Sequence, residues 1–385
     1  MGIAVSEHTS EARRAARTAA RRVPAPSQEG TAVSEGLSAQ IQVQRASTFR
    51  LDLELTAAAG EVVALLGPNG AGKSTALRVL AGLEATGTSR VELAGEVLDD
   101  PDRRVHRRPE QRAIGMVFQD YLLFAHMSAR DNVAFGLRAR GQRRRHARAS
   151  AQRWLEHVGL AQQARHRPRQ LSGGQAQRVA LARALAIEPR ALLMDEPLAA
   201  LDARTRAEVR STLAQHLREY DGVAVLVTHD ALDAMVLADR LIVLERGSVV
   251  QTGSPQDVAR RPRTDYVAGL VGLNLLRGYA SGADVTLDDG GTLRLAHPQQ
   301  GPVHVAIRPS AVSLFADRPQ GSPRNVWAGT IGQIEPRTDV LRLTVLGSPT
   351  VAADVTLDAA AALRLEPGMP VWCSVKATDL DAYPV

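Results

Sequence analysis

The spacing of apolar positions along the chain predicts two kinds of folded unit. Between about residues 41 and 270, short apolar runs alternate with stretches of helical periodicity. That alternation is typical of an α/β domain built on a largely parallel sheet. After residue 270 the chain turns to short alternating strands, such as residues 340–345, which are separated by Gly, Pro and Asp without any long helical stretch. This second pattern predicts a small all-β domain.

The same pattern indicates where the chain divides. Residues 1–38 are rich in Ala, Arg, Ser and Glu and have no sustained apolar periodicity, so we expect a disordered extension. The α/β domain is expected over residues 39–270, a linker with the start of the β region over 271–321, and a separate β domain over 322–385. No apolar run approaches the roughly 18 residues that span a bilayer. We therefore expect any contact with a membrane to go through partner proteins.

The charge pattern argues against a nucleic-acid partner. The 385 residues have a formal net charge of +6, yet the basic residues are dispersed apart from two local runs, residues 13–22 and 138–148. Neither run is interleaved with aromatic side chains, so both are interpreted as solvated faces. Cys373 is the only cysteine and cannot form an internal disulfide, which fits a reducing cytoplasm.

Lysine is almost absent from the chain. Lys73 and Lys376 are the only lysines among 47 basic residues. A lysine ammonium is a compact charge on a flexible stem, whereas an arginine guanidinium is a broad planar fork, and the two do not replace each other at a tight anion site. The two positions where lysine is kept are therefore candidates for anion binding.

The first lysine lies in a phosphate-binding motif. Residues 61–66 have the pattern of a buried strand, and residues 76–81 that of a helix. The segment between them reads Gly67-Pro68-Asn69-Gly70-Ala71-Gly72-Lys73-Ser74-Thr75, which is G-x-x-x-x-G-K-[ST] in the required context. Its glycines let backbone N–H groups point at phosphate oxygens, and the helix N-terminus adds a positive dipole end. We expect Lys73 to reach the β- and γ-phosphates of ATP and Ser74 to bind Mg²⁺.

A second buried strand, residues 191–194, runs into two carboxylates. Asp195 is suited to help coordinate Mg²⁺, and Glu196 to polarise the attacking water. On its own, an Asp-Glu pair after an apolar strand is more often a plain strand end. The phosphate motif upstream favours the catalytic interpretation.

Between these strands, residues 171–178 read Leu-Ser-Gly-Gly-Gln-Ala-Gln-Arg, which resembles the LSGGQ signature of ABC ATPases. Other elements follow in the order of that family: Gln119 is similar to its Q-loop glutamine, Leu201-Asp202 to its D-loop, and His229 to its switch histidine. The resemblance implies a P-loop α/β ATPase domain with a helical subdomain. It also implies catalytic roles for Glu196, His229 and Gln119, with Gln119 among the Mg²⁺ ligands.

The resemblance further implies a head-to-tail homodimer, in which each ATP lies between the phosphate loop of one subunit and the signature of the other. A second anion-binding helix terminus would then be formed by Ser172, Gly173, Gly174 and Gln175. Two departures from the family are visible. Ala199 stands where the D-loop often has Ser, and the segment upstream of the phosphate loop offers only Phe49 for stacking on adenine.

Further motifs, in the α/β domain and in the C-terminal part, narrow the resemblance to importers of molybdate and related anions. Residues 114–120 and 123–126 are similar to the Q-loop region of such importers, and residues 306–309 to the linker into a TOBE-type region. Residues 322–325 and 374–378 resemble the two ends of a molybdate-binding mop domain, an OB-like barrel. That resemblance implies a set of oxyanion ligands, and it places the second lysine among them: Ser322, Arg324, Lys376 and Thr378.

The resulting hypothesis is an ATP-hydrolysing subunit that energises import of molybdate or tungstate from the cytoplasmic face of a bacterial membrane. Its partners would be a second ATPase subunit, integral membrane permease subunits and, through the permease, an extracytoplasmic substrate-binding protein; no nucleic acid is expected.

A sulfate, iron or polyamine importer is an alternative, because TOBE-like tails occur there too. A soluble ABC factor usually has two cassettes or a long coiled coil, and an oxyanion store does not explain the ATPase motifs. The tail itself is either an anion site or a plain dimerisation barrel.

Overall fold

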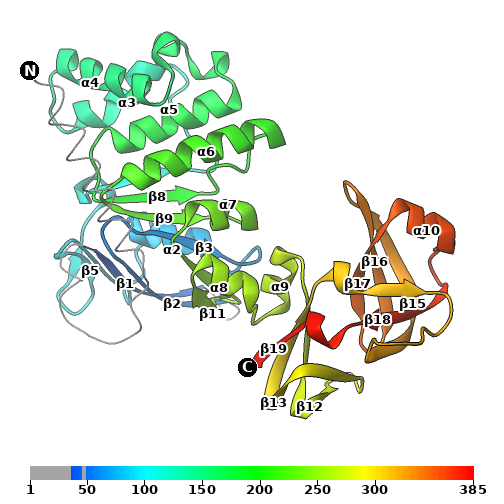
Figure 1. The fold of residues 1–385 in the computed structure, drawn as a ribbon. Helices are drawn as coiled ribbons and strands as arrows, with labels where there is room; N and C mark the ends of the chain where they lie inside the picture. Colours follow the sequence, from blue (N-terminus) through cyan, green and yellow to red (C-terminus); the bar gives the residue numbers. More distant parts are fainter. Residues whose placement is uncertain (1–35, 46–48) are drawn as a thin grey trace, which may run out of the picture.

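The computed structural model describes residues 36–45 and 49–385. The extension predicted over residues 1–38 therefore lies almost wholly outside the described residues, and β1 already begins at Leu37. Figure 1 shows a larger α/β unit, which contains β1 to β11 and α2 to α9, and a smaller β unit, which contains β12 to β19. Within the described segments, no helix is both long and apolar enough to cross a membrane.

The strands of the α/β unit form one sheet in the order β6-β5-β4-β1-β2-β11-β10-β3-β9-β8-β7. The five strands from β10 to β7 in this order run parallel, which confirms the predicted α/β class. The strand bounds are β1 (Leu37–Arg45), β2 (Phe49–Ala57), β3 (Val62–Leu66), β4 (Arg90–Leu93), β5 (Glu96–Asp100), β6 (Val105–His106), β7 (Ile114–Val117), β8 (Ala191–Asp195), β9 (Val223–Val227), β10 (Arg240–Glu245) and β11 (Ser248–Gly253).

The two faces of this sheet carry different helices because side chains alternate along a strand. Val63 and Leu65 of β3 pack with α2 in one buried cluster. Val62, Ala64 and Leu66 pack with α5, α6 and α7 in another. Strands covered on both faces become continuous apolar runs, which is why all five residues of β3 are buried. The helices are α2 (Lys73–Leu80), α3 (Ala129–Ala139), α4 (Arg144–His157), α5 (Gly173–Leu185), α6 (Ala203–Glu219), α7 (Ala231–Leu237), α8 (Pro255–Arg260) and α9 (Asp265–Val271).

A helical subdomain forms where α3, α4 and α5 pack together around a third buried cluster. Its small apolar residues, such as Ala134 and Ala151, let the helices approach closely. Arg148 on α4 bonds both carboxylate oxygens of Asp131 on α3, at 2.8 and 3.1 Å. Part of the arginine run over residues 138–148 is thus used to join two helices.

The β unit contains two sheets and one short helix. β12, β13 and β19 form a three-stranded sheet, and five strands form the other in the order β14-β18-β15-β16-β17. The mainly β character expected after residue 270 is confirmed, with α10 as a single short helix. The bounds are β12 (Asn274–Leu287), β13 (Thr292–Ile307), β14 (Ser313–Phe315), β15 (Asn325–Pro336), β16 (Val340–Gly347), β17 (Val351–Thr356), α10 (Leu357–Leu363), β18 (Pro370–Val375) and β19 (Leu380–Pro384).

Strands on both sides of residue 322 contribute to one core. One buried cluster includes residues from β12, β13 and β14 as well as from β15 to β18. Asn325, at the start of β15, accepts from the backbone N–H of Arg294 at 2.6 Å and donates to its carbonyl at 3.1 Å. The segments 271–321 and 322–385 therefore pack as one body, because the strands before residue 322 supply half of the core that the later strands need.

Two contacts fix the β unit to the α/β unit. The buried hydroxyl of Tyr383 in β19 donates to the carbonyl oxygen of Pro262 at 2.6 Å, just before α9. Arg277 in β12 forms an ion pair with Asp265 in α9 at 3.0 Å. Burial raises the pKa of Tyr383, so its hydroxyl stays a neutral donor. The last strand of the β unit is thereby tied to the end of the ATPase-like unit.

The Tyr383 contact generates a prediction about stability. Tyr383→Phe removes the hydroxyl and leaves the buried carbonyl of Pro262 without that donor, which should cost about 1–3 kcal/mol. The measurement is urea unfolding followed by tryptophan fluorescence, to which Trp327 and Trp372 of the β unit and Trp154 of α4 contribute. Tyr279→Phe is the control, because Tyr279 is exposed. An unchanged midpoint in Tyr383→Phe would show that the contact contributes nothing.

Candidate functional site

The candidate site lies where neighbouring parallel strands end. β3 runs into the loop of residues 67–72, β9 into Thr228 and His229, β8 into Glu196, and β7 into the turn with Gln119. The register pairs Leu65 with Val227 and Val227 with Asp195, so these strand ends are level. Ligands of open parallel sheets bind at the carboxyl ends of the strands. The order β3-β9-β8-β7 therefore gathers the sequence-predicted phosphate loop, switch histidine, carboxylates and glutamine at one edge.

The phosphate loop has a conformation that requires glycine. Gly67, Gly70 and Gly72 have φ angles of +154°, +80° and +103°. A Cβ on Gly67 would lie 2.1 Å from the carbonyl oxygen of Leu244, and one on Gly72 would lie 3.1 Å from the ring of Phe49. Pro68, Asn69, Ala71, Ser74 and Thr75 complete the motif around the start of α2. Phe49, the one aromatic candidate for adenine, thus packs beside the loop glycine.

Lys73 is held inside this loop. Its ammonium donates to the carbonyls of Gly67 and Pro68 at 2.7 and 3.0 Å, and the residue is 6% exposed. Burial lowers its pKa, whereas the charges of Glu196 and Asp195 act in the opposite direction. The loop therefore concentrates a positive charge and several backbone N–H groups at the start of α2, which suits a polyphosphate.

Ser74 and Asp195 bring two oxygens together. The hydroxyl of Ser74 donates to Oδ1 of Asp195 at 3.1 Å. Burial raises the pKa of Asp195, and the bond from Ser74 works against that rise. A hydroxyl and one carboxylate are the kind of ligands that Mg²⁺ accepts when phosphate oxygens and water supply the rest. This pair fits such an ion, as the sequence predicts.

Glu196 and His229 form the second polar pair of the site. Oε2 of Glu196 lies 3.2 Å from Nδ1 of His229. Glu196 has a φ of +44° and its N–H donates to the carbonyl of Val227, so backbone contacts fix where its carboxylate points. Its side chain is 17% exposed and that of His229 is 54% exposed. The carboxylate is thus largely shielded from solvent, whereas the imidazole is open to an incoming group.

Gln119 is exposed at the end of β7, and no described side chain bonds it. The two residues after Asp120, Tyr121 and Leu122, both have positive φ angles. Arg183 of α5 donates to both of their carbonyls at 2.7 Å. This arginine therefore shapes the loop that presents Gln119. Sequence reasoning missed it, because nothing near Arg183 in the chain distinguishes it from the other arginines.

The signature segment begins α5. Ser172 accepts from the N–H of Gln175, whose side chain accepts from the N–H of Ser172, which is a reciprocal capping box. A Cβ on Gly174 would lie 2.7 Å from Thr205, and one on Gly173 would lie 3.3 Å from Leu201. Both glycines thus let α5 approach the D-loop and α6. Because α2 and α5 cover opposite faces of the sheet, one chain does not bring its signature to its own phosphate loop.

The D-loop is tied to the residue that follows His229. Arg206 donates to the carbonyls of Ala199 and Leu201 at 3.4 and 3.3 Å, and to Asp230 at 3.2 Å. Asp230 in turn caps α7. Asp202 caps α6, and its bonds from the backbone and side chain of Thr205 lower its pKa. The link from Arg206 to Asp230 was also missed, since these two residues lie 24 positions apart in the chain.

The candidate oxyanion residues lie at one end of the β unit. The register pairs Asn325 with Val375, so Arg324, just before β15, and Lys376, just after β18, lie at adjacent strand ends. Ser322, Arg324, Lys376 and Thr378 are all exposed. Thr378 also lines a groove of about 1360 Å³ between the two units, which His229 lines as well. The structure thus brings Arg324 near Lys376, and no bond among the four described side chains closes a pocket.

Comparison with known proteins identifies the families and relatives that this chain matches. The ABC transporter family matches residues 51–199, and the TOBE domain family matches residues 321–382. The molybdenum import ATP-binding protein ModC of Mycobacterium tuberculosis is 44% identical over 359 residues, which cover 87% of this chain and 94% of that protein.

Two further relatives are import ATP-binding proteins. The sulfate/thiosulfate protein CysA 1 of Chromobacterium violaceum is 40% identical over 334 residues, covering 85% of this chain and 91% of that protein. The Fe(3+) protein FbpC of Agrobacterium fabrum is 38% identical over 324 residues, covering 80% and 90%. A solved structure of a dimeric ATP-binding cassette with ADP and Pi is 30% identical with a TM-score of 0.49, covering 57% of this chain and 98% of that chain.

The Glu196 geometry generates a prediction about hydrolysis. Glu196→Gln keeps the shape of the side chain but removes the carboxylate that can accept a proton from water. We expect ATP hydrolysis to fall by about a hundredfold or more, whereas ATP binding is kept and ATP traps a dimer. Phosphate release and size-exclusion chromatography with ATP measure the two effects. Glu208→Gln, on the exposed face of α6, is the control, and retained multi-turnover hydrolysis in Glu196→Gln would contradict the assignment.

Proposed function

The chain belongs to the ABC transporter family and is an ATP-hydrolysing subunit of an importer, and we propose that its cargo is molybdate, with tungstate as the nearest chemical neighbour. The observation that carries this proposal is the 44% identity to a molybdenum import protein, over a match that covers 87% of this chain and so reaches into the C-terminal β unit. A second support is the place of Lys376, one of only two lysines, beside Arg324 at an exposed end of that unit.

We assign the residues of the site as follows. Backbone N–H groups of residues 67–72 and the ammonium of Lys73 bind the phosphates of ATP. Ser74 and Asp195, joined by Gln119, would hold Mg²⁺, which would neutralise phosphate charge. Glu196 would accept a proton from the attacking water, and its contact with His229 at 3.2 Å would orient the imidazole towards the γ-phosphate.

The proposal includes a homodimer on the inner face of the membrane. The signature at the start of α5 and the phosphate loop at the start of α2 belong to opposite faces of the sheet, so a second subunit would have to complete each site. Permease subunits would hold the dimer at the membrane, and a substrate-binding protein would deliver cargo to them from outside. The Arg206 link between the D-loop and Asp230 supports communication between such an interface and His229.

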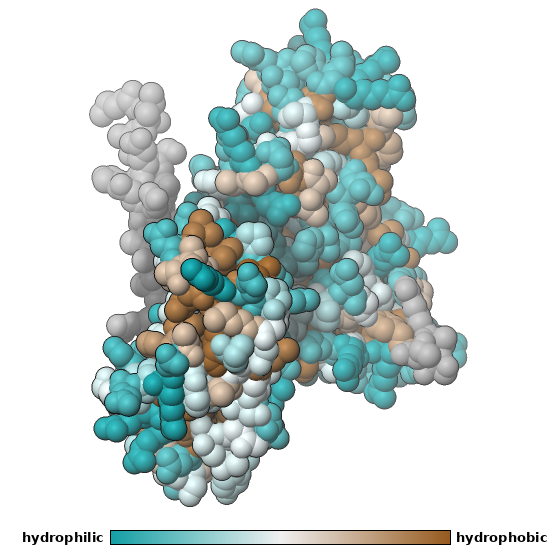
Figure 2. All heavy atoms as spheres, turned by 90° about the vertical axis from the view of Figure 1, so that its right-hand side faces the viewer, coloured by the Kyte–Doolittle hydropathy of each residue, from teal (hydrophilic) through white to brown (hydrophobic). Residues whose placement is uncertain are grey.

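The β unit supports an additional role in sensing the cargo. A tetrahedral dianion needs converging donors, and Arg324 and Lys376 supply two cationic side chains on adjacent strand ends. Ser322 and Thr378 would contribute hydroxyls. These four side chains are exposed in one chain, and we propose that two β units meet to complete the mop-like pocket. The unit has exposed apolar residues such as Leu346 and Leu357, and Figure 2 shows apolar atoms grouped on its outer face.

Occupied β units would restrain the ATPase if they favour separated ATPase units. The groove that Thr378 shares with His229 offers a direct route for this coupling. Linkage requires reciprocity, so that ATP-driven closure weakens anion binding to the same extent. Sulfate is the second candidate cargo, because a sulfate/thiosulfate import protein is 40% identical and sulfate is also a tetrahedral dianion.

The magnesium assignment generates a prediction about pH. Because burial raises the pKa of Asp195, protons compete with Mg²⁺ for its carboxylate at a higher pH than for an exposed Asp. Lowering the pH should therefore raise the Mg²⁺ concentration that half-saturates ATP binding. Titrations of Mg²⁺ at several pH values measure this shift. Asp195→Asn cannot bind this proton, so its Mg²⁺ requirement should change with pH only as far as the nucleotide itself is protonated. An equal pH dependence of the Mg²⁺ requirement in the wild type and in Asp195→Asn would contradict the prediction.

The oxyanion proposal is tested by calorimetry with molybdate on the full chain. We expect heat of binding in the wild type and at least about a tenfold loss of affinity in Lys376→Ala, since a charge-assisted bond is worth about 1.5–3 kcal/mol. Arg337→Ala is the matched control, because Arg337 is an exposed cation beyond the opposite end of β15. Sulfate and tungstate titrations then rank the anions.

Two results would count against the site, and a third would count against molybdate as the cargo. The absence of any molybdate heat in the wild type would leave the β unit as a dimerisation barrel. Equal affinity in wild type and Lys376→Ala would place the anion elsewhere. Tighter binding of sulfate than of molybdate would favour sulfate as the cargo.

A further inference from the structure

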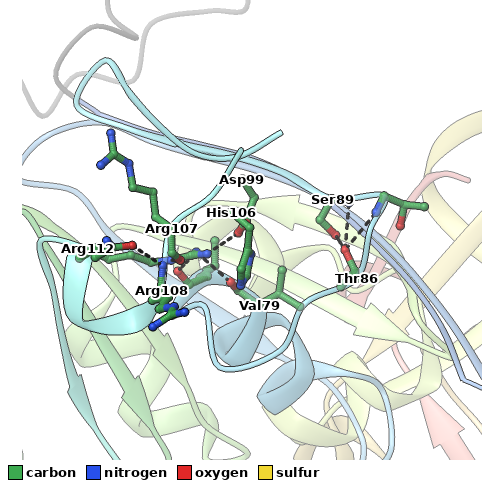
Figure 3. A network of polar contacts seen from close by, with 11 residues as sticks. Val79, Thr86, Ser89, Asp99, His106, Arg107, Arg108 and Arg112 are labelled. Carbon is green, nitrogen blue, oxygen red and sulfur yellow. Dashed lines mark hydrogen bonds and ion pairs between the residues drawn. The ribbon is translucent and has the colours of Figure 1, made fainter. Parts of the chain in front are cut away.

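Arg112 is a fully buried arginine that no motif accounts for. It lies between the short helix η2 (Pro109–Gln111) and β7, and its side chain is 0% exposed. Its Nε donates to the carbonyl of Arg107 at 2.9 Å, and one terminal nitrogen donates to the carbonyls of Val79 and Leu80 at 3.2 and 2.9 Å. The other terminal nitrogen donates to Asp99 at 2.6 Å. Figure 3 shows this guanidinium enclosed by its partners.

Two of these partners are the last carbonyls of α2. The helix ends in a Schellman motif, in which Gly82 donates to the carbonyl of Val79 and Leu83 donates to that of Arg78. That motif leaves the carbonyl of Leu80 without a backbone donor. Arg112 fills this gap and places a positive charge at the negative end of the helix dipole.

The opposite end of α2 carries the phosphate-binding groups. Lys73 and Ser74 are the first two residues of this eight-residue helix, which is about 12 Å long. A helix of two turns moves as a rigid element, so its position at one end fixes its position at the other. The chain after Arg112 also enters β7 within two residues, and β7 ends at the turn with Gln119. One guanidinium therefore joins the helix and the strand that present two parts of the site.

The counter-charge of Arg112 is itself held in place. Asp99 in β5 is 8% exposed, and its second carboxylate oxygen lies 2.5 Å from Nδ1 of His106 in β6. Both oxygens of the carboxylate are thus engaged from opposite sides. A buried ion pair with every polar atom bonded defines one geometry, because any shift would leave a charge unpaired.

Gly82 provides a second, independent observation. It has a φ of +75°, and a Cβ at this position would lie 2.4 Å from Nε and 2.6 Å from Cζ of Arg112. The helix end therefore approaches the guanidinium so closely that only glycine fits. The contact therefore depends on two residues: Arg112 supplies the guanidinium, and Gly82 leaves the space that it occupies.

We propose that Arg112 is a positioning residue for nucleotide binding, which holds the C-terminal end of α2 and thereby sets where Lys73 and Ser74 meet the phosphates of ATP. Its role is distinct from that of a general stabilising ion pair, because it acts through one helix that ends at the phosphate loop. Loss of the contact should appear as weaker ATP binding in protein that is still folded.

The first test is Arg112→Lys in the full chain. Lysine keeps the charge but cannot bond Asp99, Arg107 and the helix carbonyls together. We expect kcat/KM for ATP hydrolysis to fall by about a hundredfold, the size of effect that a small misplacement of binding groups causes. The fall should appear mainly in KM and in the Kd for ATP measured by calorimetry. Arg148→Lys, which weakens the Asp131 pair in the helical subdomain, is the control.

The second test uses a matched pair of glycines. Gly141 follows α3 with a φ of +87° in the same Schellman position as Gly82, but a Cβ there meets nothing within 4 Å. Gly82→Ala and Gly141→Ala therefore incur the same backbone strain, and only Gly82→Ala displaces Arg112. We expect KM to rise in Gly82→Ala and to stay at the wild-type value in Gly141→Ala.

Circular dichroism at the assay temperature establishes that each variant is folded. The proposal would be overturned if Arg112→Lys and Gly82→Ala lower only the thermal midpoint and keep the wild-type KM. It would also be overturned if either control, Gly141→Ala or Arg148→Lys, raises KM as much as the two test variants do. In either case Arg112 would be an ordinary stabilising residue.

Discussion

The alignment of four parallel strands is the constraint on which the ATPase site depends. β3, β9, β8 and β7 end level with one another, and each delivers one polar element from a different part of the chain. The alignment comes from burial of apolar strands on both faces, since β3 and β9 are buried throughout. Hydrophobic packing of the strands therefore places the polar groups at one edge of the sheet. Hydrogen bonds such as that from Ser74 to Asp195 then fix their exact positions.

Sequence patterns predicted the parts of the site that are built locally. The phosphate loop, the buried strand before Asp195 and the capping box at Ser172 each involve residues a few positions apart, and their geometry follows from glycine freedom and helix-end chemistry. The parts that could not be predicted are contacts between distant segments. Arg112 and Arg183 donate to backbone carbonyls far away in the chain, and Arg206 donates to the side chain of Asp230. In a chain so rich in arginine, no local signal distinguishes a buried arginine from an exposed one.

In the β unit, too, the sequence predicted local features but not the contacts between strands that are far apart in the chain. Alternation of apolar residues correctly predicted strands such as residues 340–345, because side-chain period is a local property. It did not predict which strands share a core. β14 pairs with β18 and β13 with β19, so strands from before and after residue 322 are interleaved. Asn325, noted in the sequence as part of an anion motif, holds both backbone groups of Arg294 with its side-chain amide.

The interleaving of β13 with β19 has a consequence for the order in which the β unit folds. The register pairs Ile307 with Leu380, and the whole five-stranded sheet lies in the chain between them. Closing so long a loop as an open coil is entropically unfavourable, and pairings between distant strands form slowly. A compact five-stranded sheet would bring Val375 and Leu380 back towards Ile307 and so shorten the effective loop. Closure of the three-stranded sheet is therefore expected as a late step, which makes the contact between Tyr383 and Pro262 a marker of a fully assembled chain.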